Sequence, residues 1–165
     1  MKKFVSLKLI VFSFILVASS VSFSVPAIQG GTGSDSTVAG IGNDASGENS
    51  SAFGFHNTAS GKFSSAFGFR NIASKLRSSA FGTGNKADGE DSSAFGSLNI
   101  ASGKFSSAFG SQYEVTGNSS GAFGVGKATW NNTTKVFDYD YINEGKHSYM
   151  FGNYNKIAAG TQNNF

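Results

Sequence analysis

The pentapeptide Ser-Ser-Ala-Phe-Gly recurs in this chain at a fixed interval of fourteen residues. Its copies lie at residues 50–54, 64–68, 78–82, 92–96 and 106–110, and a sixth, Ser-Gly-Ala-Phe-Gly at 120–124, keeps the interval with one substitution. A fixed period with a fixed apolar position indicates one structural unit stacked many times, because each unit buries its apolar surface against its neighbours. The sequence therefore predicts a solenoid and not a globule.

Three columns of the repeat carry structural predictions. The phenylalanine column is expected to form the core of the stack, with Phe53, Phe67, Phe81, Phe95, Phe109, Phe123, Phe137 and Phe151. Glycine and asparagine take positive φ at low cost, so these residues are expected at the corners of each coil. The corner glycines are Gly54, Gly68, Gly82, Gly96, Gly110 and Gly124, and the corner asparagines are Asn57, Asn71, Asn85 and Asn99.

Each repeat predicts two short strands joined by turns. The Ser-Ala-Phe-Gly run alternates, so phenylalanine and the serine two residues before it share one face while alanine and glycine share the other. The Asn-x-Ala stretch is expected to form the return strand. Helix is excluded by 22 glycines spread through the chain. The predicted fold is all-β, a parallel β-roll (β-solenoid) of about nine coils spaced about 4.8 Å apart.

The N-terminus differs from the rest of the chain. Lys2, Lys3 and Lys8 precede the apolar run 9–17, and small residues follow. This pattern is typical of a secretory signal peptide, and the apolar run is too short for a transmembrane helix. We expect a signal peptide at 1–24, a linker at 25–35, regular repeats at 36–126, an irregular coil or loop insertion at 127–147 and a resumed repeat at 148–165.

Composition excludes several classes of protein. Without the three lysines of the signal peptide, the remaining basic residues equal the 10 acidic ones, so a nucleic-acid partner has no electrostatic support. The chain has no cysteine, which excludes disulfides and thiolate metal sites. Disordered chains are poor in aromatic residues, whereas here 17 phenylalanines are present and largely placed by the period.

The repeat resembles the YadA-like head repeat (Hep/Hag type) of trimeric autotransporter adhesins, whose units read S-V-A-I-G-x-x-A-x-A-x-G. The matching positions in one repeat are Ser51, Ala52, Phe53, Gly54, Asn57, Ala59 and Gly61. The resemblance covers residues 36 to 165. It implies a left-handed coil, association into a homotrimer, and a surface-exposed head that binds host extracellular matrix, host cells or itself, with no contact between this segment and a membrane.

Members of this family continue into a coiled-coil stalk and a β-barrel anchor. This sequence contains neither heptads nor membrane strands, so we expect a truncated reading frame that stops within a repeat at Phe165. With an anchor, the protein would be displayed at the outer membrane of a Gram-negative-type bacterium. Without one, it would be periplasmic or secreted.

The segment 127–147 interrupts the repeat and is rich in aromatic residues. Trp130, Tyr139, Tyr141 and, just beyond, Tyr149 could present a binding surface, because tryptophan and tyrosine are enriched in binding hot spots. The alternative is a degenerate coil whose aromatic side chains cover the solenoid. We favour the degenerate coil and keep the four aromatics as candidate partner-binding residues.

No residues predict catalysis, a cofactor or a metal. His56 and His147 are far apart in the repeat, and Asp88, Glu90 and Asp91 do not recur in every coil as calcium solenoids require. We expect an adhesin head and not an enzyme. The alternatives are a secreted or periplasmic structural solenoid of the ice-binding or surface-organising class, and a disordered Phe-Gly repeat protein. The first lacks the expected threonine ladders, and the second requires no fixed spacing.

Overall fold

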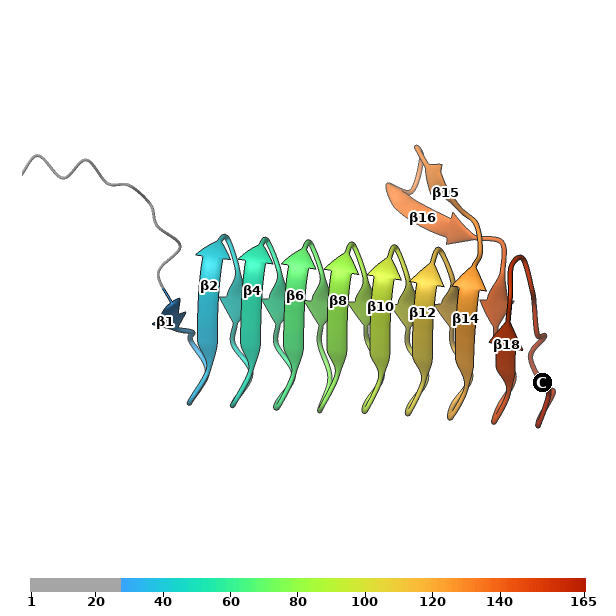
Figure 1. Cartoon of the computed structure of the whole chain (residues 1–165), viewed down its shortest axis with the longest axis horizontal. Coiled ribbons are helices and arrows are strands. Elements are labelled where there is room, and N and C mark those ends of the chain that lie inside the picture. Colours follow the sequence, from blue (N-terminus) through green and yellow to red (C-terminus); the bar gives the residue numbers. More distant parts are fainter. Residues whose placement is uncertain (1–27) are drawn as a thin grey trace, which may run out of the picture.

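The computed structural model describes residues 28–165, which form a rod of stacked coils (Figure 1). Within this range the chain contains strands and turns but no helix. The predicted signal peptide at 1–24 and the first residues of the predicted linker lie outside the described residues.

Each coil contributes one long and one short strand. The long strands are β2 (Thr37–Ile41), β4 (Ser51–Phe55), β6 (Ser65–Phe69), β8 (Ser79–Thr83), β10 (Ser93–Ser97), β12 (Ser107–Ser111), β14 (Gly121–Val125) and β18 (Tyr149–Phe151). The short strands are β3 (Asp44–Ala45), β5 (Thr58–Ala59), β7 (Ile72–Ala73), β9 (Lys86–Ala87), β11 (Ile100–Ala101), β13 (Glu114–Val115) and β17 (Ile142–Asn143). Long strands pair with long strands and short with short, which gives two parallel sheets that face each other. β1 (Ile28–Gly30) pairs antiparallel with β2 at the N-terminal end of the long sheet.

Equivalent residues of successive coils pair with one another. Phe95 of β10 lies between Phe81 of β8 and Phe109 of β12, and the same fourteen-residue step relates the flanking residues. The predicted parallel solenoid is therefore confirmed. Its long sheet holds eight parallel long strands, not nine, because one expected coil is absent.

Alanine, not phenylalanine, fills the interior of the coils. The alanines of the long strands (Ala52, Ala66, Ala80, Ala94, Ala108 and Ala122) and of the short strands (Ala59, Ala73, Ala87 and Ala101) are 0% exposed. The phenylalanines stand on the outer face of the long sheet, where those of β4 to β14 are half-buried. The prediction that they form the core is thus wrong. In the regular coils the space between the facing sheets is filled by alanine methyl groups, and Val115 and Met150 replace alanine only towards the C-terminal end, so the phenylalanine rings are placed outside.

The corner glycines allow close stacking of the coils. The six predicted corner glycines all have positive φ, and Gly96 is an example at 116°. A Cβ atom at Gly96 would overlap the carbonyl oxygen of Gly110 in the next coil. Glycine is therefore required at this column both for its backbone conformation and for space.

The corner asparagines form a buried ladder instead of adopting positive φ. The left-handed conformation belongs to the preceding residue, such as Arg70 or Leu98, with φ near 54° in both cases. Asn57, Asn71, Asn85 and Asn99 are at most 1% exposed. Each side-chain amide donates to two backbone carbonyls, one in its own coil and one in the next; for Asn85 these acceptors are Phe81 and Gly96, both at 2.8 Å. The expected role as turn residues is thus replaced by a structural role inside the stack.

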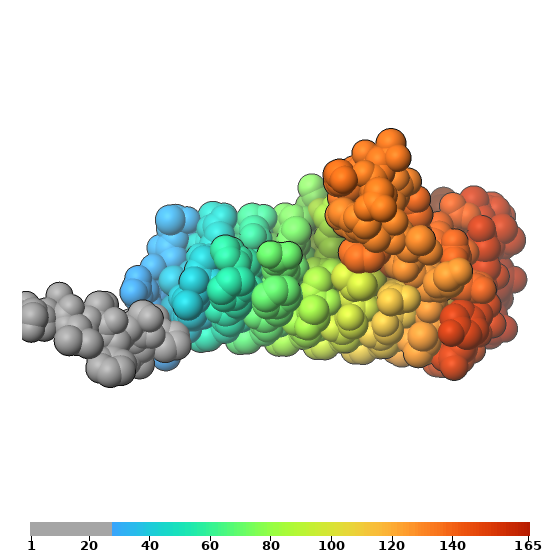
Figure 2. All heavy atoms as spheres, turned by 90° about the horizontal axis from the view of Figure 1, so that it is seen from above, coloured from blue at the N-terminus to red at the C-terminus, as the bar shows by residue number. Residues whose placement is uncertain are grey.

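A β-hairpin replaces the coil that was expected around Phe137. The hairpin consists of β15 (Ala128–Asn131) and β16 (Val136–Tyr139), and it projects from the rod (Figures 1 and 2). Phe123 pairs directly with Phe151, so residues between them form no further rung of the long sheet. The insertion has the length of one repeat, which is why Phe137 kept the register without belonging to the phenylalanine column. The degenerate coil that we favoured for this segment is therefore wrong.

Candidate functional site

The first candidate surface is a ladder of stacked phenylalanine rings, here called the phenylalanine ladder. It comprises Phe53, Phe67, Phe81, Phe95, Phe109, Phe123 and Phe151. Neighbouring ring centroids lie 4.8 to 5.2 Å apart and the rings are parallel within 9°. The spacing is that of strands in a sheet, so the repeat itself imposes the stacking.

The ladder presents an uncharged apolar stripe along the rod. The five rings from Phe53 to Phe109 each share their face of the strand with the serine two residues earlier, as Phe95 does with Ser93. A shorter second stack, Phe55 on Phe69 at 5.5 Å, lies beside it. The rings protect each other's faces but leave their edges accessible, so the ladder is suited to packing against another apolar surface.

The second candidate surface belongs to the hairpin. Trp130 pairs with Phe137 across its two strands, and their rings meet edge to face at 5.2 Å. Because directly opposed residues share a face, Ala128, Trp130, Phe137 and Tyr139 lie on one side of the hairpin, and the other side carries the polar residues Thr129, Asn131 and Asp138 together with Val136. The hairpin is therefore amphipathic.

Two hydrogen bonds hold the hairpin against the coils. The Tyr139 hydroxyl donates to the Leu98 carbonyl at 2.8 Å, and the Ala128 backbone N–H donates to Oε1 of Gln112 at 3.2 Å. Burial, and secondly the negative charge of Glu114, raise the pKa of Tyr139 to about 12. The hydroxyl thus remains a donor at any physiological pH, and the hairpin keeps its position.

A groove of about 490 Å³ lies where the hairpin overhangs the coils, and we call it the hairpin groove. Its lining residues are Phe69, Arg70, Ile72, Thr83, Gly84, Asn85, Lys86, Leu98, Ile100, Trp130, Lys135, Val136, Phe137 and Tyr139. The coils supply the first nine and the hairpin the last five. The volume is in the range of small-molecule and peptide pockets.

The four candidate partner-binding aromatics do not form one site. Trp130 and Tyr139 line the hairpin groove. Tyr141 follows the hairpin and packs against Tyr154, with ring centroids 5.2 Å apart. Tyr149 lies on β18 and stacks on Phe165 at 6.2 Å. Sequence reasoning grouped them because they are close along the chain, but the hairpin separates the first two from the others.

Tyr113 is a functional residue of the stack that the sequence analysis did not identify. It occupies the asparagine column and is 0% exposed. Its hydroxyl donates to the Gly152 carbonyl at 2.9 Å and accepts from the Asn155 backbone N–H at 3.2 Å. The longer side chain spans the gap that the hairpin leaves in the asparagine column. The signal in the sequence is that Tyr113 takes the position that asparagine holds in the five preceding repeats.

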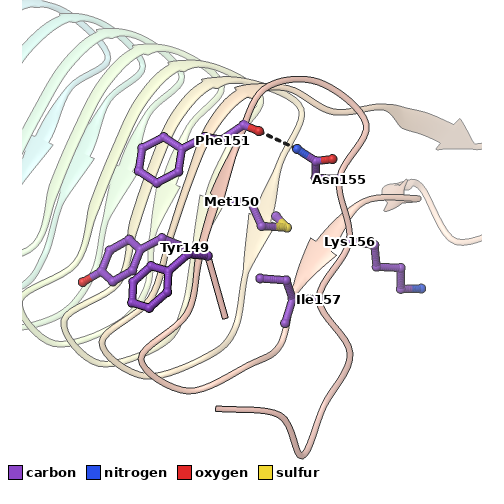
Figure 3. A pocket seen from close by; sticks show the side chains of 7 residues that line it. Tyr149, Met150, Phe151, Asn155, Lys156 and Ile157 are labelled. Carbon is purple, nitrogen blue, oxygen red and sulfur yellow. Dashed lines mark hydrogen bonds between the residues drawn. The ribbon is translucent and has the colours of Figure 1, made fainter. Parts of the chain in front are cut away.

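A smaller pocket of about 280 Å³ lies at the C-terminal end of the rod (Figure 3). Figure 3 shows Met150, Phe151 and Ile157 among the side chains that line it, and the amide of Asn155 bonded to the Phe151 carbonyl at 2.6 Å. Phe151 is 64% exposed, since no ring stacks on its outer side. This pocket is an opening of the stack and contains no charged group other than Lys156.

The clustered carboxylates of Asp88, Glu90 and Asp91 are all paired with other side chains. Asp88 is bonded to Ser74 and to Lys86, Asp91 to Arg77, and Glu90 to Lys104 at 3.0 Å. Among residues 28–165 no group of three or more potential ligands converges to hold a metal ion. The bonds of Asp88 to Ser74, Asp91 to Arg77 and Glu90 to Lys104 link neighbouring coils, which is a structural role.

In the described part of the chain, no helix has the length and apolar character needed to cross a membrane. A search of the curated proteins finds no match to the chain. The family model for the YadA head domain repeat matches it in overlapping segments, at residues 32–57, 45–71, 59–85, 73–99 and 87–112. That family is an adhesin-type structural domain and not an enzyme family. The matched segments are the coils described above, so residues 32–112 belong to the YadA head domain repeat family.

Proposed function

We propose that this chain is the adhesive head of a trimeric autotransporter, exported and exposed at the cell surface. The match to the YadA head repeat and the regular stack of coils support this function. The observation that carries it is the phenylalanine ladder, an uncharged apolar stripe that runs the length of the rod. Soluble monomers seldom leave such a stripe uncovered, which indicates a macromolecular partner.

Three copies associate through this ladder. The groups beside the rings are small serines such as Ser79 and Ser93, so identical faces can approach without opposing charges. An arrangement of the three chains around a threefold axis would cover the ring edges of all three ladders, and burial of this apolar surface would drive the association.

Adhesion is the role of the assembled head, and its partner is host matrix, a host cell or another head. The regular coils offer the same surface repeatedly, whereas the hairpin occurs once and carries an exposed Trp130. We therefore place the specific contact at the hairpin. The experiment that tests the adhesive role is binding of the purified protein to immobilised collagen and fibronectin, to host cells and to itself.

The trimer is tested separately, by sedimentation equilibrium. Phe95→Asp places a charge in the ladder and should give a monomer, whereas the wild-type chain should sediment as a trimer. Phe63→Asp is the matched control, because Phe63 lies at a corner outside the ladder and is 49% exposed. A monomeric wild-type chain would refute the trimer. A trimer that binds no matrix protein, no cell and no second head would favour the alternative, a secreted or periplasmic structural solenoid.

A further inference from the structure

We infer that the hairpin groove binds an extended acidic peptide segment that carries apolar side chains. This inference deepens the proposed adhesive function, on which it rests, because it names the chemistry of the partner and the place where it docks. The groove lies between the hairpin and the coils of β6 to β11, next to the corner of the rod and away from the phenylalanine ladder's central rings.

The walls of the groove are apolar. The hairpin contributes the rings of Trp130 and Phe137, which share one face, and Trp130 is 45% exposed. The coils contribute Ile72 and Ile100 from the outer face of the short sheet, and Leu98 from the corner. These side chains face solvent in the free protein, so a ligand that covers them gains hydrophobic free energy.

The charged groups of the groove are all positive. Arg70, Lys86 and Lys135 line it and no carboxylate does. Asp138 lies on the opposite face of the hairpin, where it accepts a hydrogen bond from Asn131 at 2.9 Å. Lys86 is shared with Asp88, but Arg70 and Lys135 form no ion pair within residues 28–165. The groove therefore complements an anion.

The hairpin also offers a backbone edge. β15 and β16 form a sheet of two strands, so within the described chain each has a strand partner on one side only. β16 supplies Val136, Phe137 and Tyr139 to the groove. An extended segment can add to such an edge through main-chain hydrogen bonds while alternate side chains enter the groove. The coils it would cross, from Phe69 to Ile100, span about 10 Å at the spacing of strands, which accommodates three or four extended residues.

The same lining argues against a carbohydrate. Sugar hydroxyls require several acceptors and donors in fixed positions, and buried hydroxyls without partners are costly. Apart from the three cations, the polar side-chain groups here belong to Thr83, Tyr139 and Asn85 and to the indole N–H of Trp130. The Tyr139 hydroxyl and the Asn85 amide already donate to backbone carbonyls of the coils. An acidic peptide with valine or phenylalanine side chains matches both the charge and the apolar walls.

Trp130 makes the inference testable, because it is the only tryptophan of the chain and lies in the groove. The probe is a peptide of about eight residues that alternates glutamate with valine and phenylalanine, long enough to exceed the groove. We expect saturable quenching or a blue shift of Trp130 emission, with affinity that falls as salt rises. Calorimetry with the same peptide gives the affinity independently.

The decisive variant is the double substitution Arg70→Glu with Lys135→Glu, which should weaken peptide binding about tenfold or more. Lys75→Glu with Lys146→Glu makes the same change in net charge at exposed residues outside the groove and should leave binding unchanged. Circular dichroism and melting of both variants verify that the solenoid and hairpin remain folded.

Several results would overturn the inference. If a peptide in which lysine replaces each glutamate binds as tightly as the acidic peptide, charge plays no part in binding. A sulfated polysaccharide that changes Trp130 emission where the peptide does not would identify a carbohydrate site. Emission that changes only with protein concentration would place a second copy in the groove. If adhesion survives the Arg70→Glu and Lys135→Glu changes and no peptide binds, the groove inference fails while the adhesive function stands. If the peptide binds but the protein does not adhere, the groove inference stands and the adhesive function fails.

Discussion

Asn85 donates two hydrogen bonds to the side-chain oxygen of Asn71, one coil earlier. Its backbone N–H lies 3.0 Å and its Nδ2 3.1 Å from Oδ1 of Asn71. The backbone carbonyls of Phe81 and Gly96 also lie 2.8 Å from this amide nitrogen, so its two hydrogens are shared among three acceptors. One buried side chain therefore satisfies polar groups of three successive coils, and the ladder links each coil to the next where the long strand ends.

We expect Asn85→Ala to lower the free energy of unfolding by about 3 kcal/mol, because it leaves buried carbonyls and the Asn71 amide oxygen short of donors. Chemical denaturation measures the change. Asn132→Ala, at an exposed position in the hairpin turn, is the matched control and should be nearly neutral. Equal stabilities of the two variants would show that water replaces the ladder.

We expect Ala80→Leu to destabilise the stack strongly, by about 3 kcal/mol or more, since Ala80 lies between Ala66 and Ala94 in a closely packed part of the core that has no space for three further carbons. Ala80 is 0% exposed between the two sheets. Ser79→Leu, on the outer face one residue earlier, adds an apolar side chain of the same size without overpacking the interior. Thermal melting compares the two variants, and a similar melting temperature for both would mean that the sheets can separate to admit leucine.

We expect deletion of residues 127–140 to leave the solenoid folded. The deleted segment has the length of one repeat, and it starts and ends where Lys127 and Asp140 form an ion pair at 3.5 Å. Gly126 would then connect directly to Tyr141, in the register that β12 and β13 have one coil earlier. The melting temperature should stay within about 5 °C of wild type.

Far-ultraviolet circular dichroism checks that the shortened chain keeps its β signal. An aggregated or unfolded deletion variant would contradict the view that the hairpin is an insertion external to the stack. The acidic peptide that we expect to bind in the hairpin groove should not bind to the folded deletion variant.

We expect Glu114→Gln to raise the melting temperature at pH 7 and to flatten its dependence on pH. Burial, and secondly the charge of Glu144, raise the pKa of Glu114, although Lys86 partly opposes them. As pH rises above the ordinary carboxyl pKa, Glu114 loses its proton in the unfolded chain before it does so in the folded chain. The folded protein therefore loses stability as pH rises, until Glu114 is also ionised in the folded chain.

Melting curves between about pH 4 and pH 7 measure this dependence. Glu48→Gln is the matched control, because Glu48 forms an exposed ion pair with Lys62 at 2.8 Å. A steeper loss of stability with rising pH in the Glu114→Gln variant than in wild type would contradict the proposed cause.

The parallel stack could be predicted because the period is strict. Five identical pentapeptides at one interval admit only a structure in which equivalent residues are neighbours, and Phe81, Phe95 and Phe109 are neighbours in the long sheet. The asparagine column was recognised but misinterpreted. Positive φ and a buried amide ladder both favour asparagine at a corner, and the sequence contains nothing that distinguishes them.

The hairpin groove could not be predicted. Its residues come from separate coils and from an insertion, and Arg70 and Lys135 line one groove because the bonds of Tyr139 and Ala128 hold the hairpin against the coils. Phe137 keeps the fourteen-residue count although it lies in the hairpin. An insertion as long as one repeat preserves the count of residues, and counting cannot tell whether those residues form a coil.

The sequence by itself determined the period, the strand pairing and the set of side chains that share each face of a strand, because these follow from local alternation and repetition. Only the tertiary structure decided which face is inside. That choice depends on the distance between the long and short sheets, which is set by the turns at both ends of a coil. The gap admits the methyl group of Ala80 and excludes the ring of Phe81, so phenylalanine forms an outer ladder and alanine the core.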